Sequence, residues 1–275
     1  HGPCLDGWTA SWLASLRWPD AELVPQAYDD SVSQLTMSVF VFQVDGKPAA
    51  FNFVGRDVLV LDFSYERDVL LSMKAAARSI LVLDHHATAA ADLAGLDFAI
   101  FDMERSGAGL ALDAFFPGAR EAWRDGIRCV DIGGKQIQIA QLVEDRDLWR
   151  FKIHGSRAIN VALDLVPRPL EEWNRLPSLD DLEMKGTAML EYQRHLVERM
   201  ADHAYEVEWL EGKILAVNAS YLASEVGEAV AKRAPAPLKT ALVWYRHEDG
   251  HFACSLRSTP DGADVSVMAK KRGGG

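Results

Sequence analysis

The stretch Leu81-Val82-Leu83-Asp84-His85-His86 joins a short apolar run to an acid and two imidazoles. The run over residues 80–83 is typical of a buried strand, so Asp84, His85 and His86 are expected to leave its carboxyl end together. Open α/β sheets place their chemistry at that end. An isolated His-His pair would more often have one imidazole bonded to the backbone and the other in solvent. Three other places in the chain repeat the pattern, and they favour a functional site.

Two further apolar runs end in carboxylates, and the chain begins with potential ligands. The run over residues 58–61 stops at Asp62, and the run over residues 137–143 stops at Glu144-Asp145-Arg146-Asp147. The first residues are His1-Gly2-Pro3-Cys4-Leu5-Asp6-Gly7. One such Asp often caps the next helix. If both runs are strands of one parallel sheet, the carboxylates and imidazoles form a ring of hard ligands, suited to a pair of divalent metal ions and to phosphoryl transfer.

These residues resemble the motifs of the DHH phosphoesterase superfamily. His1 and Asp6 are similar to its first motif, Asp62 to its second, Asp84-His85-His86 to its third and Asp145 to its fourth. The C-terminus resembles the associated DHHA1 domain, whose signature is an arginine strand, here Ser255-Leu256-Arg257-Ser258, followed by a glycine run within residues 268–275. The match spans nearly the whole chain in the right order. Within the superfamily it is most similar to the nanoRNase and oligonucleotide phosphodiesterase branch.

The pattern of elements predicts an α/β protein with two lobes. Alternating strands and helices in the first part predict a mostly parallel sheet with helices on both faces, the DHH lobe. Hairpin turns and a single helix near the C-terminus predict a smaller α+β lobe, DHHA1-like. A long helix over residues 179–200 would join them. We therefore expect a catalytic domain over residues 1–180, a helical linker over 181–203 and a substrate-binding domain over 204–275.

Two segments of the first lobe could contribute to the site. Strands over residues 38–44 and 48–53, around a turn at Asp45-Gly46, predict a hairpin that could cover the site. The helix start at Arg105-Ser106-Gly107-Ala108-Gly109 could hold a phosphate on its backbone N–H groups. A Ser cap, with glycines for close packing, explains the same residues equally well.

The resemblance implies a metal centre. One metal would be held by Asp6, Asp62, His85 and Asp145, and a second by His1, Asp62 and a further ligand of the first motif. Mn²⁺ is the expected ion, with Mg²⁺ or Zn²⁺ as alternatives. Two bridged divalent ions can activate a water and stabilise the entering and leaving oxygens at phosphorus. His86 would then bond the phosphate or deliver a proton, and Asp84 would orient an imidazole.

The sequence departs from the family pattern at two points. Cys4 stands where many relatives have an Asp, which makes a second metal uncertain, because a thiolate favours Zn²⁺ and an uncoordinated thiol supplies no anionic ligand. A small buried side chain is an equally good reading of Cys4. In the fourth motif both Asp145 and Asp147 are available. We take Asp145 as the ligand, with Asp147 as the second choice, because Trp149 then aligns with an aromatic of the family.

Basic and glycine residues near the C-terminus would bind substrate. By resemblance these are Arg257, Ser258, Lys270, Gly273, Gly274 and Gly275. Arg can grip a phosphate bidentately, and glycines let backbone N–H groups approach it. Without the resemblance, such a basic cluster would more simply be a solvated face.

Composition limits the classes of partner. The chain has 275 residues, 49% of them hydrophobic, and a formal net charge of -11. That charge disfavours long double-stranded nucleic acid. No apolar run approaches the length of a membrane span, and no signal-peptide pattern is present. Three widely spaced cysteines indicate a reducing compartment, which we take to be the cytoplasm. Both ends look cut, with flanking residues expected beyond them, and a homodimer is compatible with the sequence.

The expected function is hydrolysis of short oligonucleotides or dinucleotides to mononucleotides by a metal-activated water. One alternative is a phosphomonoesterase that acts on a nucleotide such as 3′-phosphoadenosine 5′-phosphate. Another is a non-catalytic nucleotide-binding protein, if Cys4 disables the second metal. The chain has no Gly-x-Ser-x-Gly elbow and no P-loop, which disfavours a serine hydrolase and a P-loop enzyme.

Overall fold

The structure is a computed structural model that describes residues 4–24, 34–36, 39–44, 47–51, 53–124, 132–209 and 211–274. The chain divides into two compact units, His1–Thr187 and Ala188–Gly275. The sequence prediction of a linker over residues 181–203 falls on α9 (Leu179–Ala201), the helix in which the two units meet. The fold is mixed α/β, as predicted, and each unit is described by itself.

A parallel three-stranded sheet forms the centre of the first unit. Its strands lie in the order β4-β5-β6, namely β4 (Asp57–Leu61), β5 (Ser79–Asp84) and β6 (Ala99–Phe101). Helices α2 (Arg67–Ala76) and α3 (Ala87–Asp92) connect them. Leu61 pairs with Leu83, so β4 and β5 end at almost the same level. This register brings the residues that follow the two strands to one edge of the sheet.

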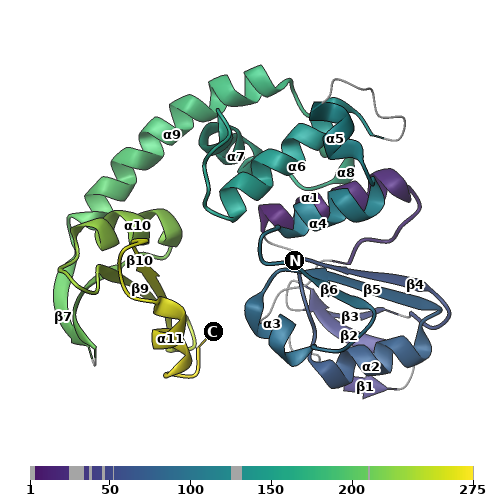
Figure 1. Ribbon diagram of the computed structural model, residues 1–275, viewed down its shortest axis with the longest axis horizontal. Coiled ribbons are helices and arrows are strands. Elements are labelled where there is room, and N and C mark those ends of the chain that lie inside the picture. The colour runs from purple at the N-terminus through teal and green to yellow at the C-terminus, as the bar shows by residue number, and fades with distance from the viewer. Residues whose placement is uncertain are drawn as a thin grey trace. The chain divides into compact units, whose positions relative to one another are not determined.

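Both faces of this sheet are covered by helices. Its strands are accordingly apolar at consecutive positions. Val58, Val60, Ile80 and Val82 pack with Leu70 and its neighbours on α2. Leu61 and Leu83 belong to a second cluster with residues of α1 (Leu5–Arg17) and α4 (Gly107–Phe115). Figure 1 shows α2 and α3 on one side of the sheet and α1 and α4 on the other. The predicted sheet with helices on both faces is thus present, with three strands.

A layer of helices completes the first unit. It contains α5 (Ala119–Arg124), α6 (Gly134–Asp147), α7 (Ser156–Asp164) and α8 (Leu170–Asn174), together with the start of α9, residues 179–187. Trp12 of α1 is fully buried here against Trp173 of α8, with ring centroids 5.3 Å apart, and its Nε1 donates to Asn174 Oδ1. These contacts join the first helix of the chain to one that lies about 160 residues later.

The prediction of a strand over residues 137–143 is wrong, because these residues lie within α6. The alternation Ile137-Gln138-Ile139 imitates a strand, yet Ile137, Ala140 and Val143 follow the three-residue spacing of a helix face. Ile139 and Leu142 are also buried, because α6 contacts the α1–α4 layer on one side and α7 on another. A helix that is buried on two sides lacks the single apolar stripe by which a helix is recognised.

A small antiparallel sheet lies between α1 and β4 in the chain. It consists of β1 (Gln34–Thr36), β2 (Val39–Val44) and β3 (Lys47–Phe51), in that order. Val44 pairs with Lys47, which confirms the two predicted strands of the hairpin. The predicted turn at Asp45-Gly46 lies outside the described residues.

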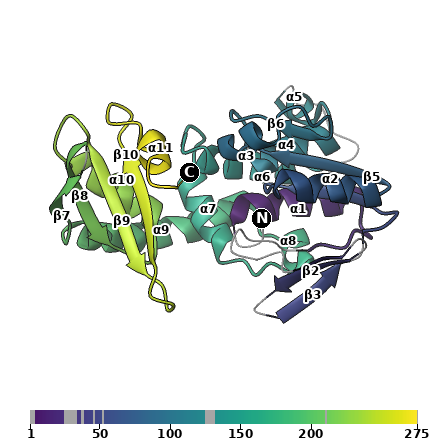
Figure 2. The same cartoon turned by 90° about the horizontal axis from the view of Figure 1, so that it is seen from below.

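The second unit contains a mixed four-stranded sheet in the order β10-β9-β8-β7, with β8 and β9 parallel and the outer pairs antiparallel. The strands are β7 (Tyr205–Trp209), β8 (Gly212–Asn218), β9 (Thr240–Arg246) and β10 (Phe252–Ser258). Helix α10 (Ala223–Arg233) makes the crossover from β8 to β9 and packs on the sheet through Val226 and Val230. The sequence predicts these elements correctly, whereas α11 (Val265–Lys270) was not expected. Figure 2 shows the four strands side by side.

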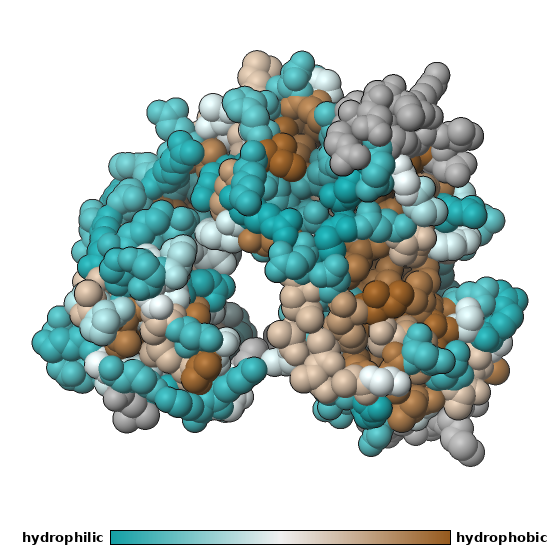
Figure 3. All heavy atoms as spheres, viewed as in Figure 1, coloured by the Kyte–Doolittle hydropathy of each residue, from teal (hydrophilic) through white to brown (hydrophobic). Residues whose placement is uncertain are grey.

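Helix α9 carries mainly polar surface. Most of its side chains are exposed or half-buried, and Figure 3 shows hydrophilic residues along it. None of the helices in the described ranges has the length and apolar character needed to cross a membrane.

Two neighbouring leucines of α2 test the assignment of its buried face. Leu70 is fully buried and Leu71 is 43% exposed. We expect Leu70→Ala to lower the free energy of unfolding by about 2–5 kcal/mol, because it removes buried methyl groups and leaves a cavity. Leu71→Ala is the matched control and should cost less than about 1 kcal/mol. Urea unfolding of both variants measures the difference, and equal losses would show that the face is wrongly assigned.

Candidate metal centre

Asp62 follows β4 directly and has an unusual backbone conformation. Its φ of 53° lies in the left-handed region, which Asp tolerates better than most residues. Its N–H donates to Leu83 O at 2.9 Å, which continues the pairing with β5 by one residue. Only 2% of the residue is exposed. Strained backbone recurs at functional sites, where the surrounding structure holds it in place.

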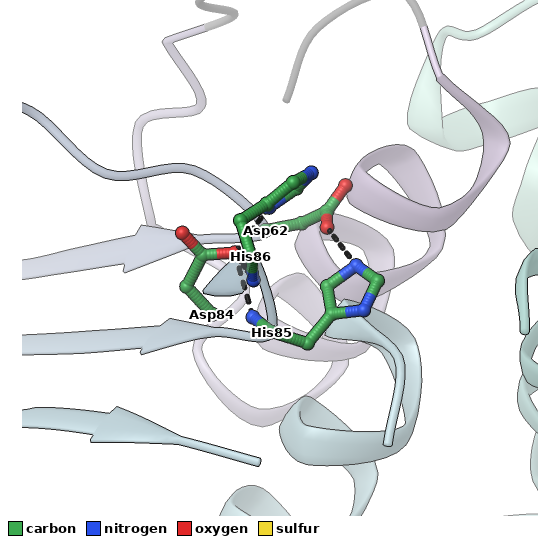
Figure 4. Close-up of side chains that lie close together, drawn as sticks. All are labelled: Asp62, Asp84, His85 and His86. Atoms are coloured by element: carbon green, nitrogen blue, oxygen red, sulfur yellow. Dashed lines mark hydrogen bonds and ion pairs between the residues drawn. The ribbon is translucent and has the colours of Figure 1, made fainter. Parts of the chain in front are cut away.

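Asp84, the last residue of β5, organises the two histidines that follow. One carboxylate oxygen, Oδ1, lies 2.6 Å from His86 Nδ1 and accepts from the backbone N–H of His85 at 2.7 Å. The other, Oδ2, accepts from Ser64 Oγ at 2.6 Å. Figure 4 shows Asp84 between the backbone of His85 and the ring of His86. The fully buried Asp84 therefore orients an imidazole, and that imidazole belongs to His86.

His85 points in a different direction, toward carboxylates of three other elements. Its Nε2 lies 3.2 Å from Asp62 Oδ1, 3.6 Å from Asp147 Oδ2 and 4.0 Å from Asp6 Oδ2. Figure 4 shows the His85 ring facing the Asp62 carboxylate. The rings of His85 and His86 nevertheless stay close, with centroids 4.8 Å apart, so both imidazoles face the same region past the strand end. Residues that are far apart in the sequence meet at His85.

The start of α4 holds Asp6. The backbone N–H of Gly107 donates to Asp6 Oδ2 at 2.6 Å, and Ser106 Oγ and the N–H of Ala108 donate to Oδ1 at 2.7 and 3.0 Å. The donors proposed for a phosphate are thus occupied by a carboxylate of the same chain, which corrects that interpretation. Ser106 also accepts from the N–H of Gly109, as a helix cap does.

Gly107 is required by this arrangement. A Cβ at this position would lie 2.4 Å from Asp62 Cβ and 2.9 Å from Asp6 Oδ2. The helix start can therefore approach both acids only because residue 107 has no side chain.

Glu144 braces the same helix start from the other side. Its carboxylate accepts from Arg105 Nε at 2.8 Å and pairs with Arg120 at 3.2 Å. Arg105 also pairs with Asp113 and donates to Gly109 O. A Cβ on Gly109 would fall 1.6 Å from Glu144 Oε2, so any side chain there would displace the Glu144 carboxylate from this contact. These contacts fix the turn whose N–H groups hold Asp6.

Asp145 and Asp147 have different surroundings. The Asp145 carboxylate accepts from the backbone N–H groups of Lys152 and Ile153 at 2.9 and 3.2 Å. Asp147 is the residue close to His85. The preference for Asp145 came from aligning Trp149 with an aromatic of the family. A strand would have placed both acids on one face, whereas α6 separates them by about 200° around its axis. The geometry therefore places the second choice, Asp147, in the cluster, and Asp145 in a supporting contact.

The charges of the cluster act strongly on one another. Burial raises the pKa of Asp6, and the neighbouring Asp62 and Asp147 charges raise it further. Burial also raises the pKa of Asp147. Burial lowers the pKa of His85, but the hydrogen bond with Asp62 and the nearby Asp147 charge have the larger combined effect. They raise the pKa of His85 to about 9. Although burial acts against it, the pKa of Asp62 is lowered by its bonds with His85 and Cys4.

Cys4 contacts this centre as a thiol. Its Sγ donates to Asp62 Oδ2 at 3.0 Å and accepts from the N–H of Gly7 at 3.1 Å. Burial and the Asp62 charge raise the pKa of the thiol far above its usual value, so the thiolate is disfavoured. Cys4 is therefore both a helix cap and a neighbour of the acid that was predicted to bridge two metals.

Two overlapping sets of side chains in the described residues can hold a metal ion. One consists of Asp62, Asp84, His85 and His86, and the other of Asp6, His85 and Asp147. Within each set the ligand atoms lie within 4.8 Å of one another. Carboxylate oxygens and imidazole nitrogens suit a divalent ion such as Mn²⁺ or Zn²⁺. The predicted residues Asp6, Asp62 and His85 are brought together, while His1 lies outside the described residues.

The predicted substrate-binding residues belong to the second unit. Arg257 of β10 donates to Ser224 Oγ at 3.2 Å and to Leu256 O at 2.9 Å, and burial lowers its pKa. Ser258 ends the same strand, and Lys270 ends α11. Gly273 has a φ of 76°, and the N–H of Gly274 donates to Ala269 O. Gly275 lies outside the described residues.

Sequence reasoning missed three supporting residues. Ser64 bonds Asp84, Ser106 bonds Asp6, and Glu144 braces α4. Ser106 was noted only as a cap or a phosphate ligand, and Glu144 only as one acid of a run. Their partners lie 20 to 100 positions away in the chain, so no local pattern identifies the contacts.

Comparisons with known proteins give relatives without a described activity. No family model matches the chain. An uncharacterized protein of Acanthamoeba polyphaga mimivirus, R106, is 27% identical over 294 residues, which cover all of this chain and 64% of that protein. A crystal structure of an uncharacterized protein from Helicobacter pylori G27 gives a TM-score of 0.39 at 11% identity, covering 98% of this chain and 87% of that one. The function must therefore be argued from the site.

We expect metal binding to release a proton from His85. Its pKa of about 9 means that the ring is mostly protonated at pH 7.5, whereas coordination requires the neutral ring. Titration calorimetry with Mn²⁺ in buffers of different ionisation enthalpy should show release of about one proton at pH 7.5. The release should fall as the pH rises through 9, and the apparent affinity should increase over the same range.

Two variants control this measurement. His85→Gln should lower the release by the share that comes from the imidazolium, and it should weaken binding by at least about 10-fold. The side chain of His154 is 95% exposed and lies outside the cluster, so His154→Gln should leave both quantities unchanged. Proton release that is as large in His85→Gln as in the wild type would contradict the assignment.

Proposed function

We propose that this protein is a metal-dependent phosphodiesterase that hydrolyses short oligonucleotides or dinucleotides to mononucleotides. The observation that carries the proposal is the convergence of Asp6, Asp62 and Asp147 on His85 at the ends of two parallel strands. Together with the Asp84-His85-His86 motif, it supports membership of the DHH superfamily, with the second unit as a DHHA1-like domain. Asp147 takes the place first assigned to Asp145.

The donor set fits a divalent metal. Three carboxylates around one imidazole leave an excess of buried negative charge, which a cation would neutralise. Asp62, His85, Asp6 and Asp147 would hold the first ion, and Asp62 can share its second oxygen with another. Such an ion supplies Lewis acidity and a lowered pKa for bound water. Mn²⁺ is the proposed ion, with Mg²⁺ or Zn²⁺ as alternatives.

His86 is placed to act as an acid. Its Nδ1 is fixed by Asp84, so proton transfer to a leaving oxygen falls to Nε2. The hydrogen bond to Asp84 raises the pKa of the imidazole although burial opposes it, which keeps the ring protonated closer to neutral pH. Its side chain is 39% exposed, more than that of His85, at 14%. Solvent and substrate can therefore approach His86.

The second unit would supply an anion site. Arg257 donates to Ser224 Oγ and Leu256 O and lies close enough to Glu225 to feel its charge. Gly227 lets the stem of Arg257 lie against α10, since a Cβ there would be 2.7 Å from Arg257 Cγ. A guanidinium can bind a phosphate oxygen pair. Ser258, Lys270 and the glycines that follow α11 are the further candidates. The net charge of -11 favours a short substrate over a long polyanion.

The contact between Cys4 and Asp62 supports one competing function. A neutral thiol that bonds Asp62 Oδ2 occupies the oxygen needed to bridge two ions. With one ion the protein would bind a nucleotide without cutting it. Cys4→Asp distinguishes the two functions, because it should create activity only if the thiol is the defect.

The test is hydrolysis by the full chain with Mn²⁺, Mg²⁺, Zn²⁺ or EDTA. Substrates are a labelled RNA dinucleotide, a strand of about 20 nucleotides and 3′-phosphoadenosine 5′-phosphate. We expect metal-dependent release of mononucleotides, faster from the dinucleotide than from the long strand. His86→Ala should lower kcat by about 10²–10⁴-fold with metal affinity retained, because it removes only the acid.

His154→Ala is the matched control and should keep full activity, since its side chain is 95% exposed. Dinucleotide binding without cleavage in any metal would instead favour the binding protein. Cleavage of 3′-phosphoadenosine 5′-phosphate alone would indicate a phosphomonoesterase.

A further inference from the structure

The loop after α6 holds two aromatic residues in a strained backbone. Trp149 and Phe151 have φ values of 54° and 49°, which bulky side chains rarely adopt. Their rings meet edge to face at 4.9 Å, and both are only partly buried. Core packing does not require this conformation. An observed strain of this kind points to a function for the side chains that it positions.

Asp145 fixes the loop in this conformation. Its carbonyl oxygen accepts from the N–H groups of Arg150 and Phe151 at 2.8 and 3.3 Å. Its carboxylate accepts from Lys152 and Ile153. Four successive backbone donors are thus held by one buried residue. The loop is preorganised, so little ordering would be needed on binding a ligand.

Arginines surround the two rings. The guanidinium carbon of Arg157 lies 3.4 Å from the centroid of the Phe151 ring and 5.6 Å from that of Trp149. That of Arg146 lies 5.9 Å from the Trp149 ring. Aromatic rings and guanidinium planes are the groups on which nucleobases stack. In an acidic protein, such a group is well suited to a flat, electron-rich ring that carries a phosphate.

The aromatic pair follows one acid of the candidate metal centre closely in the chain. A single residue, Leu148, separates Trp149 from Asp147, whose carboxylate lies 3.6 Å from His85 Nε2. One short segment, residues 147–151, thus carries both an acid of the cluster and the aromatic pair.

We propose that Trp149 and Phe151, with Arg157, form a stacking subsite for a nucleobase of the substrate. This subsite rests on the proposed function, since it gives the phosphodiesterase its preference for nucleotides over other phosphate esters. It is sequence-tolerant, because every base offers a flat face for stacking. The subsite selects substrates that carry a nucleobase, while the metal centre acts on their phosphate.

The test compares adenosine 5′-monophosphate with ribose 5-phosphate, which lacks the base. Calorimetry on the full chain, with Mn²⁺ and again with EDTA, gives both affinities without any need for turnover. We expect the wild type to prefer the nucleotide by about 5- to 150-fold. Trp149→Ala should remove that preference with the affinity for ribose 5-phosphate unchanged. Trp149→Phe should retain most of it.

Trp18→Ala is the matched control, because Trp18 is 42% exposed and packs against Phe115, away from the loop. It should bind both ligands as the wild type does. Three results would overturn the subsite. They are equal affinities of the wild type for the two ligands, no binding of either ligand at about 10 mM, and an unchanged preference for the nucleotide in Trp149→Ala.

Thermal unfolding checks that the variants fold. If Trp149→Ala does not fold, the subsite is tested by the wild-type preference for the nucleotide and by the same comparison in Phe151→Leu. A base preference in a protein that cleaves no dinucleotide would reject the phosphodiesterase but keep the subsite. Cleavage with no base preference would reject the subsite alone.

Discussion

The first unit depends on one electrostatic constraint, the meeting of three carboxylates at a single imidazole. Asp6 and Asp62 are almost fully buried, and Asp147 is largely so. An imidazolium can balance only one of them, which is why burial and mutual repulsion raise the pKa values of Asp6 and Asp147. A divalent cation would satisfy the same oxygens without protons. The arrangement therefore fits the proposed metal centre.

The rest of the unit keeps these charges in place. The parallel sheet delivers Asp62 and Asp84 to one edge, and the glycines at the start of α4 let its N–H groups reach Asp6. Glu144 and Arg105 brace that turn, and Asp145 shapes the loop that follows Asp147. Fixed dipoles and charges of this kind hold ligands with little reorganisation, which is what a catalytic site requires.

Local patterns in the sequence predict the strands and most of the helices. The apolar run before Asp84 identifies β5, and Gly and Asp residues mark the turns of the second unit. The same local patterns give the wrong structure for α6, because its two buried faces hide the helical period. The choice between Asp145 and Asp147 was wrong for the same segment. Supporting contacts such as Glu144 with Arg105 depend on tertiary structure alone. The motif residues were recognisable because their chemistry is unusual, whereas their partners are ordinary serines and charges.

A Mn²⁺ soak with anomalous diffraction tests the central claim most directly. We expect an anomalous peak bound by Asp62 and His85, with Asp6 or Asp147 as further ligands, at about 2.0–2.3 Å from their atoms. A second peak beyond Asp62, toward Cys4, would show that the thiol tolerates a second ion. No peak at these residues at saturating Mn²⁺, with the His85 to Asp62 contact unchanged, would contradict the metal centre.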